Sequence, residues 1–343
     1  MRYTLLGNSG LRVSELALGT MTFGPDWGWG ADEPTSRKMF ERFAEAGGNF
    51  VDTADKYTAG SSERIVGDLV RADRDYFVLA TKYSLATREN DPNTGGNHRK
   101  NLVQSLDASL RRLGTDYVDL LWVHAWDFLT GVDEVMRALD DQVRLGKVLY
   151  VGISDTPAWI VSRAQTVAEL RGWTPFAGLQ VEYSLVQRDV ERELLPMARA
   201  LGLGITAWSP LGGGLLTGKF NAGSAGVDTG GRLGAVDEDR LRIPRAVAAV
   251  AAELGVPSSH VALAWLRAQR DVVPIVGART VDQLDENLGA LDLALPEDAL
   301  RRLDEVSAIR LGWPHDFLEA VPGVLFGEGV RERIDVPAGR RRV

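Results

Sequence analysis

Short apolar runs alternate along this chain with longer segments whose apolar residues recur at helical spacing. The eight apolar runs are Leu16–Met21, Phe50–Val51, Tyr76–Ala80, Tyr117–Val123, Val148–Ile153, Gly178–Val181, Gly204–Trp208 and Val272–Val276. The helical segments are Thr35–Ala46, Ser62–Arg71, Arg99–Leu113, Val132–Leu145, Ala158–Arg171, Val190–Leu201, Ser258–Arg270 and Glu297–Ser307. Strands that alternate with helices pair in parallel, so the pattern predicts an α/β fold, a closed (β/α)8 TIM barrel. The competing open doubly wound sheet would need a Gly-x-Gly-x-x-Gly turn after its first strand, and this chain has none there.

A small β-hairpin is predicted before the first barrel strand. Tyr3–Leu6 and Leu11–Val13 flank the turn cluster Gly7–Gly10, and we expect this N-terminal β-hairpin to plug one end of the barrel. Barrels of this length are commonly single domains with long loops. We therefore assign residues 1–308 to one barrel domain and residues 309–343 to a C-terminal tail of the same domain.

Three segments exceed the minimal alternation of strands and helices. Ser84–His98 is a polar loop after the third apolar run, and Phe220–Asp239 is rich in glycine. The tail from Ile309 to Val343 carries the aromatic residues Trp313 and Phe317. Long loops in compact domains are usually either functional lids or disordered segments, so both interpretations apply to these three.

Four polar residues stand at or just after the ends of three predicted strands. Asp52 and, five residues later, Tyr57 follow the second apolar run. Lys82 follows the third run and His124 follows the fourth. Taken singly, these residues have ordinary interpretations as a cap, a half-buried aromatic, a surface charge and a core histidine. Barrel enzymes gather their active sites at the rim formed by strand ends, so the joint order predicts an acid/base site.

At these residues the chain resembles the aldo-keto reductases, over a stretch from about Tyr3 to Asn287. No single motif is decisive, but their order along the chain is specific. The motifs are Asp52-Thr53-Ala54 with Tyr57, Ala80-Thr81-Lys82, Ser105 to Asp119 with Leu120-Leu121-Trp122-Val123-His124, Gly152-Ile153-Ser154, Trp208-Ser209-Pro210-Leu211, Leu216-Thr217-Gly218-Lys219 and Gly277-Ala278-Arg279.

The resemblance implies an NADPH-dependent oxidoreductase that reduces an aldehyde or ketone to an alcohol. In that family pattern Tyr57 is the general acid, Lys82 tunes it, and Asp52 is the partner of Lys82. His124 orients the substrate. No side chain supplies a hydride, so redox work requires a cofactor. A phenol with a pKa of about 10 donates poorly until a cation stabilises the phenolate, so we expect Lys82 to make Tyr57 more acidic.

The second half of the chain resembles the nucleotide site of the same family. Ser154 and Gln180 are expected to hydrogen-bond the nicotinamide carboxamide, and Trp208 to stack on its ring. Arg279, at a predicted helix N-terminus, suits an adenosine 2′-phosphate, which favours NADPH over NADH. The full set expected to bind the cofactor is Gly19, Thr20, Met21, Asp52, Ser154, Asp155, Gln180, Trp208, Ser209, Pro210, Leu211, Gly212, Lys219, Gly277, Ala278, Arg279, Gln283, Glu286 and Asn287.

One cofactor position departs from the commonest family pattern, because Asp155 stands where the family most often has Asn. An ionised carboxylate accepts hydrogen bonds but donates none. It would take the carboxamide NH2 and repel the carboxamide oxygen. We hypothesise that Asp155 either turns partly away or favours the cationic, oxidised nicotinamide ring.

Tryptophans cluster on loops expected at the catalytic rim, which predicts an aromatic-lined pocket for a bulky apolar carbonyl. The residues expected to contact the substrate are Trp27, Trp29, Tyr57, His124 and Trp126. The resemblance implies that Ser84–His98 and the tail also shape this pocket. Trp313 in the tail is an additional candidate for its lining. It further implies that Phe220–Asp239 covers the cofactor.

Composition argues against several other classes of protein. The chain has no cysteine, which excludes disulfides and thiolate nucleophiles, and its four histidines lack the spacing of a helical zinc motif, so no metal is expected. A formal charge of -8 argues against nucleic-acid or anionic-membrane binding, and we interpret the basic Gly339–Arg342 as a solvated end. No run reaches the roughly 18 apolar residues of a membrane span, and the first residues lack a signal-peptide core. A cytoplasmic location is expected.

Two alternatives remain at this stage. One is a cofactor-binding regulatory subunit of the same fold, and the other is an aldolase in which Lys82 forms a Schiff base. Turnover of carbonyl compounds separates the first from a reductase, and borohydride trapping would reveal the second. The sequence sets neither the substrate, nor the direction of the reaction, nor the oligomeric state, and a homo-oligomer is compatible with it.

Overall fold

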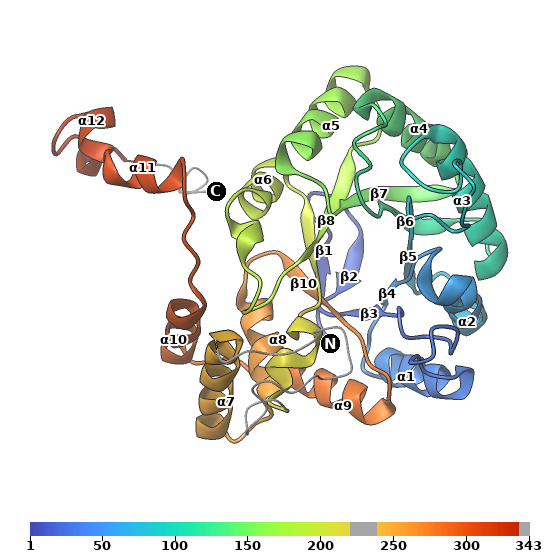
Figure 1. The fold of residues 1–343 in the computed structure, drawn as a ribbon, viewed down its shortest axis with the longest axis horizontal. Coiled ribbons are helices and arrows are strands. Elements are labelled where there is room, and N and C mark those ends of the chain that lie inside the picture. Colours follow the sequence, from blue (N-terminus) through green and yellow to red (C-terminus); the bar gives the residue numbers. More distant parts are fainter. Residues whose placement is uncertain (220–238, 336–343) are drawn as a thin grey trace.

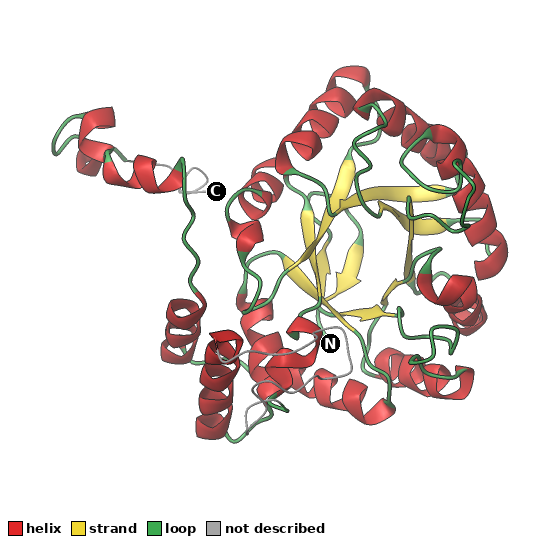
Figure 2. Ribbon diagram, in the orientation of Figure 1, coloured by secondary structure: helices red, strands yellow, loops and turns green. Residues whose placement is uncertain are grey.

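The computed structural model describes residues 1–219 and 239–335. Within them, eight parallel strands close into a barrel in the order β10-β3-β4-β5-β6-β7-β8-β9, with helices around the outside (Figures 1 and 2). The strands are β3 (Ala17–Gly19), β4 (Phe50–Asp52), β5 (Val78–Tyr83), β6 (Val118–Val123), β7 (Val148–Ser154), β8 (Phe176–Glu182), β9 (Gly204–Trp208) and β10 (Val272–Val276). The predicted (β/α)8 barrel is confirmed.

The helices follow the predicted periodicity closely, with one addition. Those around the barrel are α1 (Glu33–Glu45), α2 (Ser61–Val70), α3 (Arg99–Leu113), α4 (Val132–Arg144), α5 (Ala158–Arg171), α6 (Leu194–Leu201), α7 (Arg242–Leu254), α8 (Ser258–Ala268), α9 (Val281–Gly289) and α10 (Glu297–Ser307). Helix α7 was not predicted. Pro244 lies in its first turn. Backbone N–H groups there have no intrahelical acceptor, so a proline, which lacks the N–H, breaks no helical hydrogen bond. Helix α6 begins later than predicted because Asp189–Glu191 forms a separate 3-10 turn.

The N-terminal hairpin closes one end of the barrel, as predicted. Strands β1 (Tyr3–Leu5) and β2 (Arg12–Ser14) pair antiparallel, and Leu6 and Val13 are buried against the barrel interior. The backbone amide of Asn8 donates to the carbonyl of Gly202 over 2.8 Å, just before β9 begins. Gly7 has φ +57, and a Cβ there would lie 2.4 Å from the Gly202 oxygen, so only glycine fits this approach. The hairpin therefore seals the amino-terminal end, and the strand carboxyl ends form the open rim.

The largest side chain in the barrel interior is an indole. Trp122 on β6 is fully buried in a cluster that includes Phe50 and Leu120. The neighbouring strand β7 makes room for it with Gly152, because a Cβ at that position would lie 2.3 Å from Trp122 Cε3. The interior is thus a packed core, as in other barrels of this type, and the chemistry is confined to the rim.

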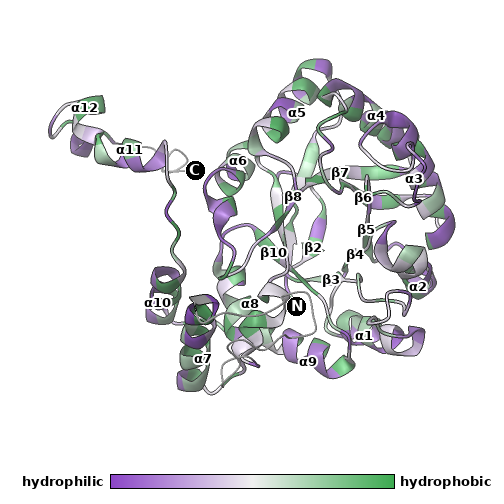
Figure 3. Ribbon diagram, in the orientation of Figure 1, coloured by the Kyte–Doolittle hydropathy of each residue, from purple (hydrophilic) through white to green (hydrophobic). Residues whose placement is uncertain are grey.

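The outer ring shows the amphipathic pattern that the sequence predicts. Figure 3 shows hydrophobic residues along the strands and hydrophilic residues on the outer sides of helices such as α3 and α4. Within residues 1–219 and 239–335, no single helix is long and apolar enough to cross a membrane. The pair α7 and α8 passes that test only when taken together, and it is bent by 100°.

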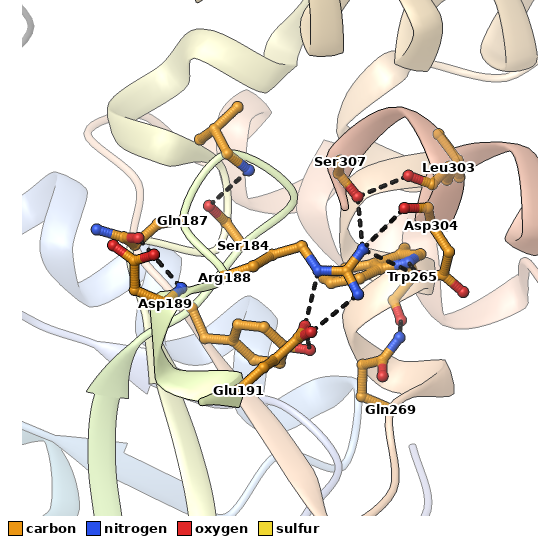
Figure 4. A network of polar contacts seen from close by, with 12 residues as sticks. Ser184, Gln187, Arg188, Asp189, Glu191, Trp265, Gln269, Leu303, Asp304 and Ser307 are labelled. Carbon is orange, nitrogen blue, oxygen red and sulfur yellow. Dashed lines mark hydrogen bonds and ion pairs between the residues drawn. The ribbon is translucent and has the colours of Figure 1, made fainter. Parts of the chain in front are cut away.

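An arginine network joins the end of the barrel sequence to the loop after β8 (Figure 4). Arg188 donates to both carboxylate oxygens of Glu191, at 2.7 and 2.9 Å, and to Ser307 Oγ on α10 at 2.7 Å. Its guanidinium also lies 5.1 Å from the centroid of the buried Trp265 ring on α8. Because the paired Arg188 is itself largely buried, this network fixes α8 and α10 against the barrel.

The tail leaves the barrel rather than covering it. Helices α11 (His315–Ala320) and α12 (Pro322–Phe326) lie outside the helical ring, beyond α6 (Figure 1). The tail contacts this side through Arg192, which donates to the carbonyl of Arg310 over 3.0 Å. Trp313 is 78% exposed and packs on Phe317, so it does not line the barrel mouth as the sequence had suggested.

Candidate active site

The centre of the rim is a buried ion pair between neighbouring strands. Asp52 ends β4, and Lys82 lies near the end of β5 with no exposed side-chain surface. The Lys82 ammonium contacts Asp52 Oδ2, and it donates to the Thr53 carbonyl at 2.9 Å and to Tyr57 Oη at 3.2 Å. The second carboxylate oxygen of Asp52 accepts from Gln180 Nε2 at 3.0 Å. Both charges are therefore paired and hydrogen-bonded, as burial requires.

A strained turn presents Tyr57 to this pair. The chain leaves β4 and folds into a short 3-10 segment, Tyr57–Gly60, in which Thr58 and Ala59 have φ of 43° and 52°. Such left-handed residues cost free energy and persist only where the surroundings fix them. Here Thr58 Oγ1 donates to the Phe23 carbonyl at 2.7 Å and accepts from the Ser62 amide at 3.0 Å. These bonds hold the phenol over Lys82.

The electrostatics of Tyr57 differ from the sequence-based expectation. Burial raises the pKa of Tyr57, and although Lys82 lowers it, Asp52 raises it again, so the phenol is less acidic than normal. Lys82 lowers the pKa of Tyr57 as expected, but burial outweighs this effect, so the expected net acidification of Tyr57 was wrong. Burial also opposes the charge on Lys82, but Asp52 and Tyr57 outweigh it and raise the pKa of Lys82. At neutral pH Lys82 is charged and Tyr57 keeps its proton.

His124 completes the group of four predicted catalytic residues. It follows β6, and its ring centroid lies 5.9 Å from that of Tyr57 at an interplanar angle of 82°. Burial, and secondarily Lys82, lower the pKa of His124 to about 3, so the imidazole is neutral at pH 7. Its Nδ1 is buried without a hydrogen-bond partner among the described residues.

The three predicted substrate tryptophans lie at the rim at different depths. Trp27 packs edge-on against Tyr57 with centroids 6.5 Å apart, and Trp29 stands 5.6 Å from Trp27. Trp126 lies in the loop that follows His124 and packs, partly buried, against the core. Of the three tryptophans, Trp27 is therefore the one that lies directly beside Tyr57.

The expected nicotinamide residues lie on β7, β8 and β9. Ser154 Oγ is buried and has no hydrogen-bond partner in the part of the chain that the structure describes. Trp208 Nε1 donates to Asp155 Oδ1 at 3.2 Å, so this carboxylate is turned toward the indole. Loss of hydration beside the surrounding protein raises the pKa of Asp155. The hydrogen bond from Trp208 and the charge of Lys82 act in the opposite direction and lower it. The unpartnered hydroxyl beside Gln180 and the Trp208 face fits an amide-bearing ring.

The expected pyrophosphate residues follow β9 in a tight glycine-rich turn. Ser209 has φ 55, and its Oγ accepts from the Gly213 amide at 3.1 Å. The segment Gly212–Thr217 is a short 3-10 element, and Lys219 Nζ would lie 3.0 Å from a Cβ at Gly214. Pro210 is buried and Leu211 is half-buried behind this turn. Closely spaced backbone amides and an ammonium form a setting suited to an anion.

The expected adenosine residues stand at the start of α9, beside the end of β3. The Arg279 amide donates to Gln283 Oε1 at 2.9 Å, and the Arg279 side chain is exposed. Asn287 Nδ2 donates to the Gly277 carbonyl at 3.4 Å, while Glu286 accepts from Ser259. Strand pairing places β10 against β3, so Ala278 lies near the segment Gly19, Thr20 and Met21, where Thr20 Oγ1 donates to the Asp52 carbonyl at 3.0 Å.

The other predicted segments fall elsewhere. Loop 84–98 is tied to the loop after β6 by Asn97, which donates its amide to Asp127 at 2.7 Å. Residues 220–238 of the glycine-rich loop and the basic residues 339–342 lie outside the described residues. No group of three or more His, Cys, Asp or Glu side chains within 1–219 and 239–335 is placed to hold a metal ion.

Sequence reasoning missed a second polar cluster behind the first. Glu63 on α2 is fully buried, and it accepts from Thr81 at 2.6 Å and from Arg112 Nε at 2.6 Å. Asp55, also buried, lies beside this pair. The alternation of β5 gave one usable signal: Thr81 precedes Lys82, so its side chain must point to the opposite face of the strand, toward the helices.

Comparison with known proteins agrees with this geometry. A family model described as the Aldo/keto reductase family matches residues 15–308. The norsolorinic acid reductase of Aspergillus flavus is 40% identical over 329 residues, covering 93% of this chain and 84% of the relative. An uncharacterised oxidoreductase, YrpG, of Bacillus subtilis is 40% identical, covering 89% and 96%. An aryl-alcohol dehydrogenase [NADP(+)] of Phanerodontia chrysosporium is 37% identical, covering 93% and 87%.

Proposed function

Because this chain belongs to the aldo-keto reductase family and is an oxidoreductase, we propose that it reduces an aldehyde or ketone to an alcohol, with NADPH as hydride donor and Tyr57 as proton donor. The observation that carries the proposal is the position of Tyr57 Oη, 3.2 Å from the buried Lys82 ammonium at the open rim. The rim is where a substrate reaches the strand ends, because the hairpin seals the other end.

Tyr57 is suited to hold its proton until the reaction needs it. Its raised pKa keeps the phenol neutral in the free protein. When negative charge develops on the substrate oxygen, that oxygen becomes the stronger base, and the proton moves from Tyr57 Oη to it. The nearby Lys82 ammonium then stabilises the phenolate that remains, in a site with little water. Asp52 keeps Lys82 charged and oriented throughout.

His124 has a positioning role in this proposal. Its pKa of about 3 leaves a neutral imidazole, which can donate one N–H to the substrate oxygen without placing a second full positive charge beside Lys82. Its ring stands nearly perpendicular to that of Tyr57, with centroids 5.9 Å apart, so both side chains lie beside the same part of the rim.

When bound, NADPH would supply the hydride. Ser154, Asp155, Gln180 and Trp208 would hold the nicotinamide end, and the unpartnered Ser154 hydroxyl supports this role. The turn after Ser209 and Lys219 would face the pyrophosphate. Arg279 at the start of α9 would bind the 2′-phosphate, and the name of one relative includes NADP(+). A charged hydrogen bond of roughly 1.5 to 3 kcal/mol gives about a tenfold to hundredfold preference for NADPH over NADH.

The substrate we propose is an aromatic carbonyl compound. Trp27 stands edge-on to Tyr57, with Trp29 beside it, so a flat ring can pack there. The names of two relatives refer to norsolorinic acid and to aryl alcohols.

The test is NADPH oxidation with a panel of aromatic and small aldehydes and ketones, in the wild type and in Tyr57→Phe. We expect the variant to lose about 10²- to 10⁴-fold in kcat, the usual share of general acid catalysis. Its NADPH affinity, measured by fluorescence titration, should be nearly unchanged. A variant that keeps its rate would exclude Tyr57 as proton donor. NADPH binding without turnover of any carbonyl would favour a regulatory subunit instead.

The Schiff-base alternative is disfavoured by the state of Lys82. Such a lysine must be neutral to attack a carbonyl carbon. The raised pKa of Lys82, caused chiefly by Asp52 against the opposing effect of burial, keeps the amine protonated.

A further inference from the structure

The ammonium group of Lys82 has as many acceptors around it as it has N–H groups. It contacts Asp52 Oδ2, and it donates to the Thr53 carbonyl at 2.9 Å and to Tyr57 Oη at 3.2 Å. An ammonium group has three donors and no acceptor, so each N–H has one of these partners. The first two acceptors therefore set the direction of the third N–H. Any residue that holds Asp52 or the Thr53 carbonyl also holds the contact between Lys82 and Tyr57.

The two acceptors are held by different parts of the barrel. Asp52 is held by Gln180 on β8, whose Nε2 donates to Oδ1 at 3.0 Å. Thr53 follows β4 directly, and its amide donates to the carbonyl of Ala80 on β5 at 2.9 Å. Its Oγ1 lies 2.9 Å from Ser62 Oγ near the start of α2. Ser62 therefore helps to fix the residue that carries the second acceptor of Lys82.

The Ser62 hydroxyl is fully buried and joins three segments of the rim. It donates to the carbonyl of Thr20, just after β3, at 2.7 Å. This bond uses its one proton, so the Thr53 hydroxyl is the donor in the contact between Thr53 and Ser62. The Ser62 amide donates to Thr58 Oγ1 at 3.0 Å, in the left-handed turn that carries Tyr57. One residue thus ties the end of β3 to the end of β4 and to the turn of the proposed acid.

The hydroxyl groups around Ser62 form a cluster behind the rim. Thr20, Thr53, Thr58 and Ser62 all have 0% exposed surface. Buried hydroxyl groups cost free energy unless they are hydrogen-bonded, and here they bond to one another and to backbone carbonyls. A fully bonded buried network is rigid, and removing one member leaves another without its partner. Loss of the Ser62 hydroxyl would free the side chain of Thr53.

We propose that Ser62 is a positioning residue for carbonyl reduction, which acts through Thr53 to aim the Lys82 ammonium at Tyr57. This inference rests on the proposed function and adds to it a residue that lies behind the reacting groups. When Tyr57 gives up its proton, the phenolate needs the ammonium at its oxygen, and a small displacement of that charge raises the barrier. The loss should therefore appear in kcat and leave substrate and cofactor binding unchanged.

The first test removes the hydroxyl group from either end of the contact. Ser62→Ala and Thr53→Val are assayed with NADPH and 4-nitrobenzaldehyde. Each should lower kcat about twofold to tenfold, the usual range for one neutral hydrogen bond. KM for the aldehyde and NADPH affinity, measured by fluorescence titration, should stay near the wild-type values. Because both changes break the same contact, the double variant should be no slower than the slower single variant.

The control is Ser36→Ala, which removes another fully buried hydroxyl group near the start of the neighbouring helix α1, where it donates to the Ala31 carbonyl. Its kcat should equal that of wild type. If Ser62→Ala does not fold, Thr53→Val decides in the same way, because it leaves the bond between Ser62 and Thr20 intact. Wild-type kcat in both hydroxyl variants, a rise in KM alone, or losses that multiply in the double variant would overturn the positioning role.

A second measurement needs neither cofactor nor turnover. In protein labelled with ¹³C-tyrosine, the Cζ resonance of Tyr57, assigned by its loss in Tyr57→Phe, reports hydrogen bonding at the phenol oxygen. In Ser62→Ala and Thr53→Val it should move toward its position in Asp52→Leu/Lys82→Met, which lacks the ammonium group. It should not move in Ser36→Ala.

This resonance separates the inference from the proposed reaction. If no carbonyl compound is reduced, yet the Tyr57 resonance moves in both hydroxyl variants, the reaction fails and the positioning of Lys82 by Ser62 stands. An unchanged resonance in both variants would overturn the positioning even if carbonyl reduction is observed.

Discussion

Asp52 and Asp55 lie three residues apart at the end of β4, and both are almost completely buried. Asp52 points toward the barrel axis, where Lys82 and Gln180 occupy its two oxygens. Asp55 points the other way, toward Ser105 on α3, beside the fully buried Glu63. Asp52 is part of a closed ion-pair network. The pKa of Asp55 is raised to about 8, chiefly by burial.

The difference shows that burial alone does not set the role of a carboxyl group. Asp52 needs its charge, because the charge holds Lys82 in place. Asp55 is tolerated as a neutral acid, because burial and the neighbouring Glu63 raise its pKa. Substitutions at Lys82, the partner of Asp52, and at Asp55 itself should show this difference in stability.

The largest effect is expected from Lys82→Met. The variant leaves Asp52 buried without its cation, which typically costs about 3 to 5 kcal/mol of unfolding free energy. It should also abolish turnover, since the phenolate of Tyr57 loses its stabilising charge. Urea unfolding monitored by circular dichroism measures the first effect. The double variant Asp52→Leu/Lys82→Met should recover most of the stability but none of the activity. An unstable double variant would mean that the pair itself, and not the unpaired charge, stabilises the fold.

The next largest effect is expected from Asp55→Asn. This variant should raise the free energy of unfolding, in contrast to Lys82→Met, and the gain should depend on pH. The folded pKa of about 8 lies above the unfolded value, so stability is fully present at acidic pH and is lost as pH rises toward 8. Asn does not titrate, so the variant should gain on wild type between pH 5 and pH 8, by roughly 2 to 4 kcal/mol. Glu63 raises the cost in wild type, and Arg112 limits it. Unfolding curves at both pH values test this; an equal difference at pH 5 and pH 8 would contradict it.

A smaller effect is expected at a third carboxylate, Asp155, which is exposed and held by Trp208. If its charge favours the cationic ring, Asp155→Asn should weaken NADP+ relative to NADPH. Exposed charge pairs contribute at most about 1 kcal/mol, or roughly fivefold in the ratio of affinities. Parallel fluorescence titrations with the two cofactor forms measure that ratio. An unchanged ratio would leave Asp155 with an orienting role toward Trp208 alone.

The smallest effect is expected at His124, whose protonation state should not change between pH 5 and pH 8. With a pKa of about 3, the ring gains no proton between pH 5 and pH 8, in contrast to Asp55, which titrates in that range. Its imidazole NMR signals, assigned by their loss in His124→Gln, should stay constant across that interval. A titration step near pH 6.5 would show that the ring is hydrated and charged, and would remove it as a neutral donor.

The sequence predicted the barrel and the meeting of Asp52, Tyr57, Lys82 and His124, because both follow from one rule. Parallel strands bring their carboxyl ends to one rim, so residues at those ends must gather. It could not predict where Asp55 points, since the turn after β4 passes through the left-handed residues Thr58 and Ala59 and has no periodicity.

The sequence also gave the wrong sign for the acidity of Tyr57. Charge neighbours can be inferred from motif order, but the loss of hydration can be known only once the depth of burial is known. The position of the tail could not be predicted from the sequence either. Its apolar residues, such as Trp313 and Val324, are of a type that is usually buried, yet they are exposed.

The fit between Trp122 and Gly152 constrains how this chain can diverge. An alanine at residue 152 would clash with the indole while the tryptophan remains, and a smaller residue at 122 would leave a void worth about 3 to 5 kcal/mol while the glycine remains. Each substitution is harmful on its own and becomes acceptable only after the other. The two positions are epistatic, so lineages of this barrel should inherit them as a pair and exchange them together or not at all.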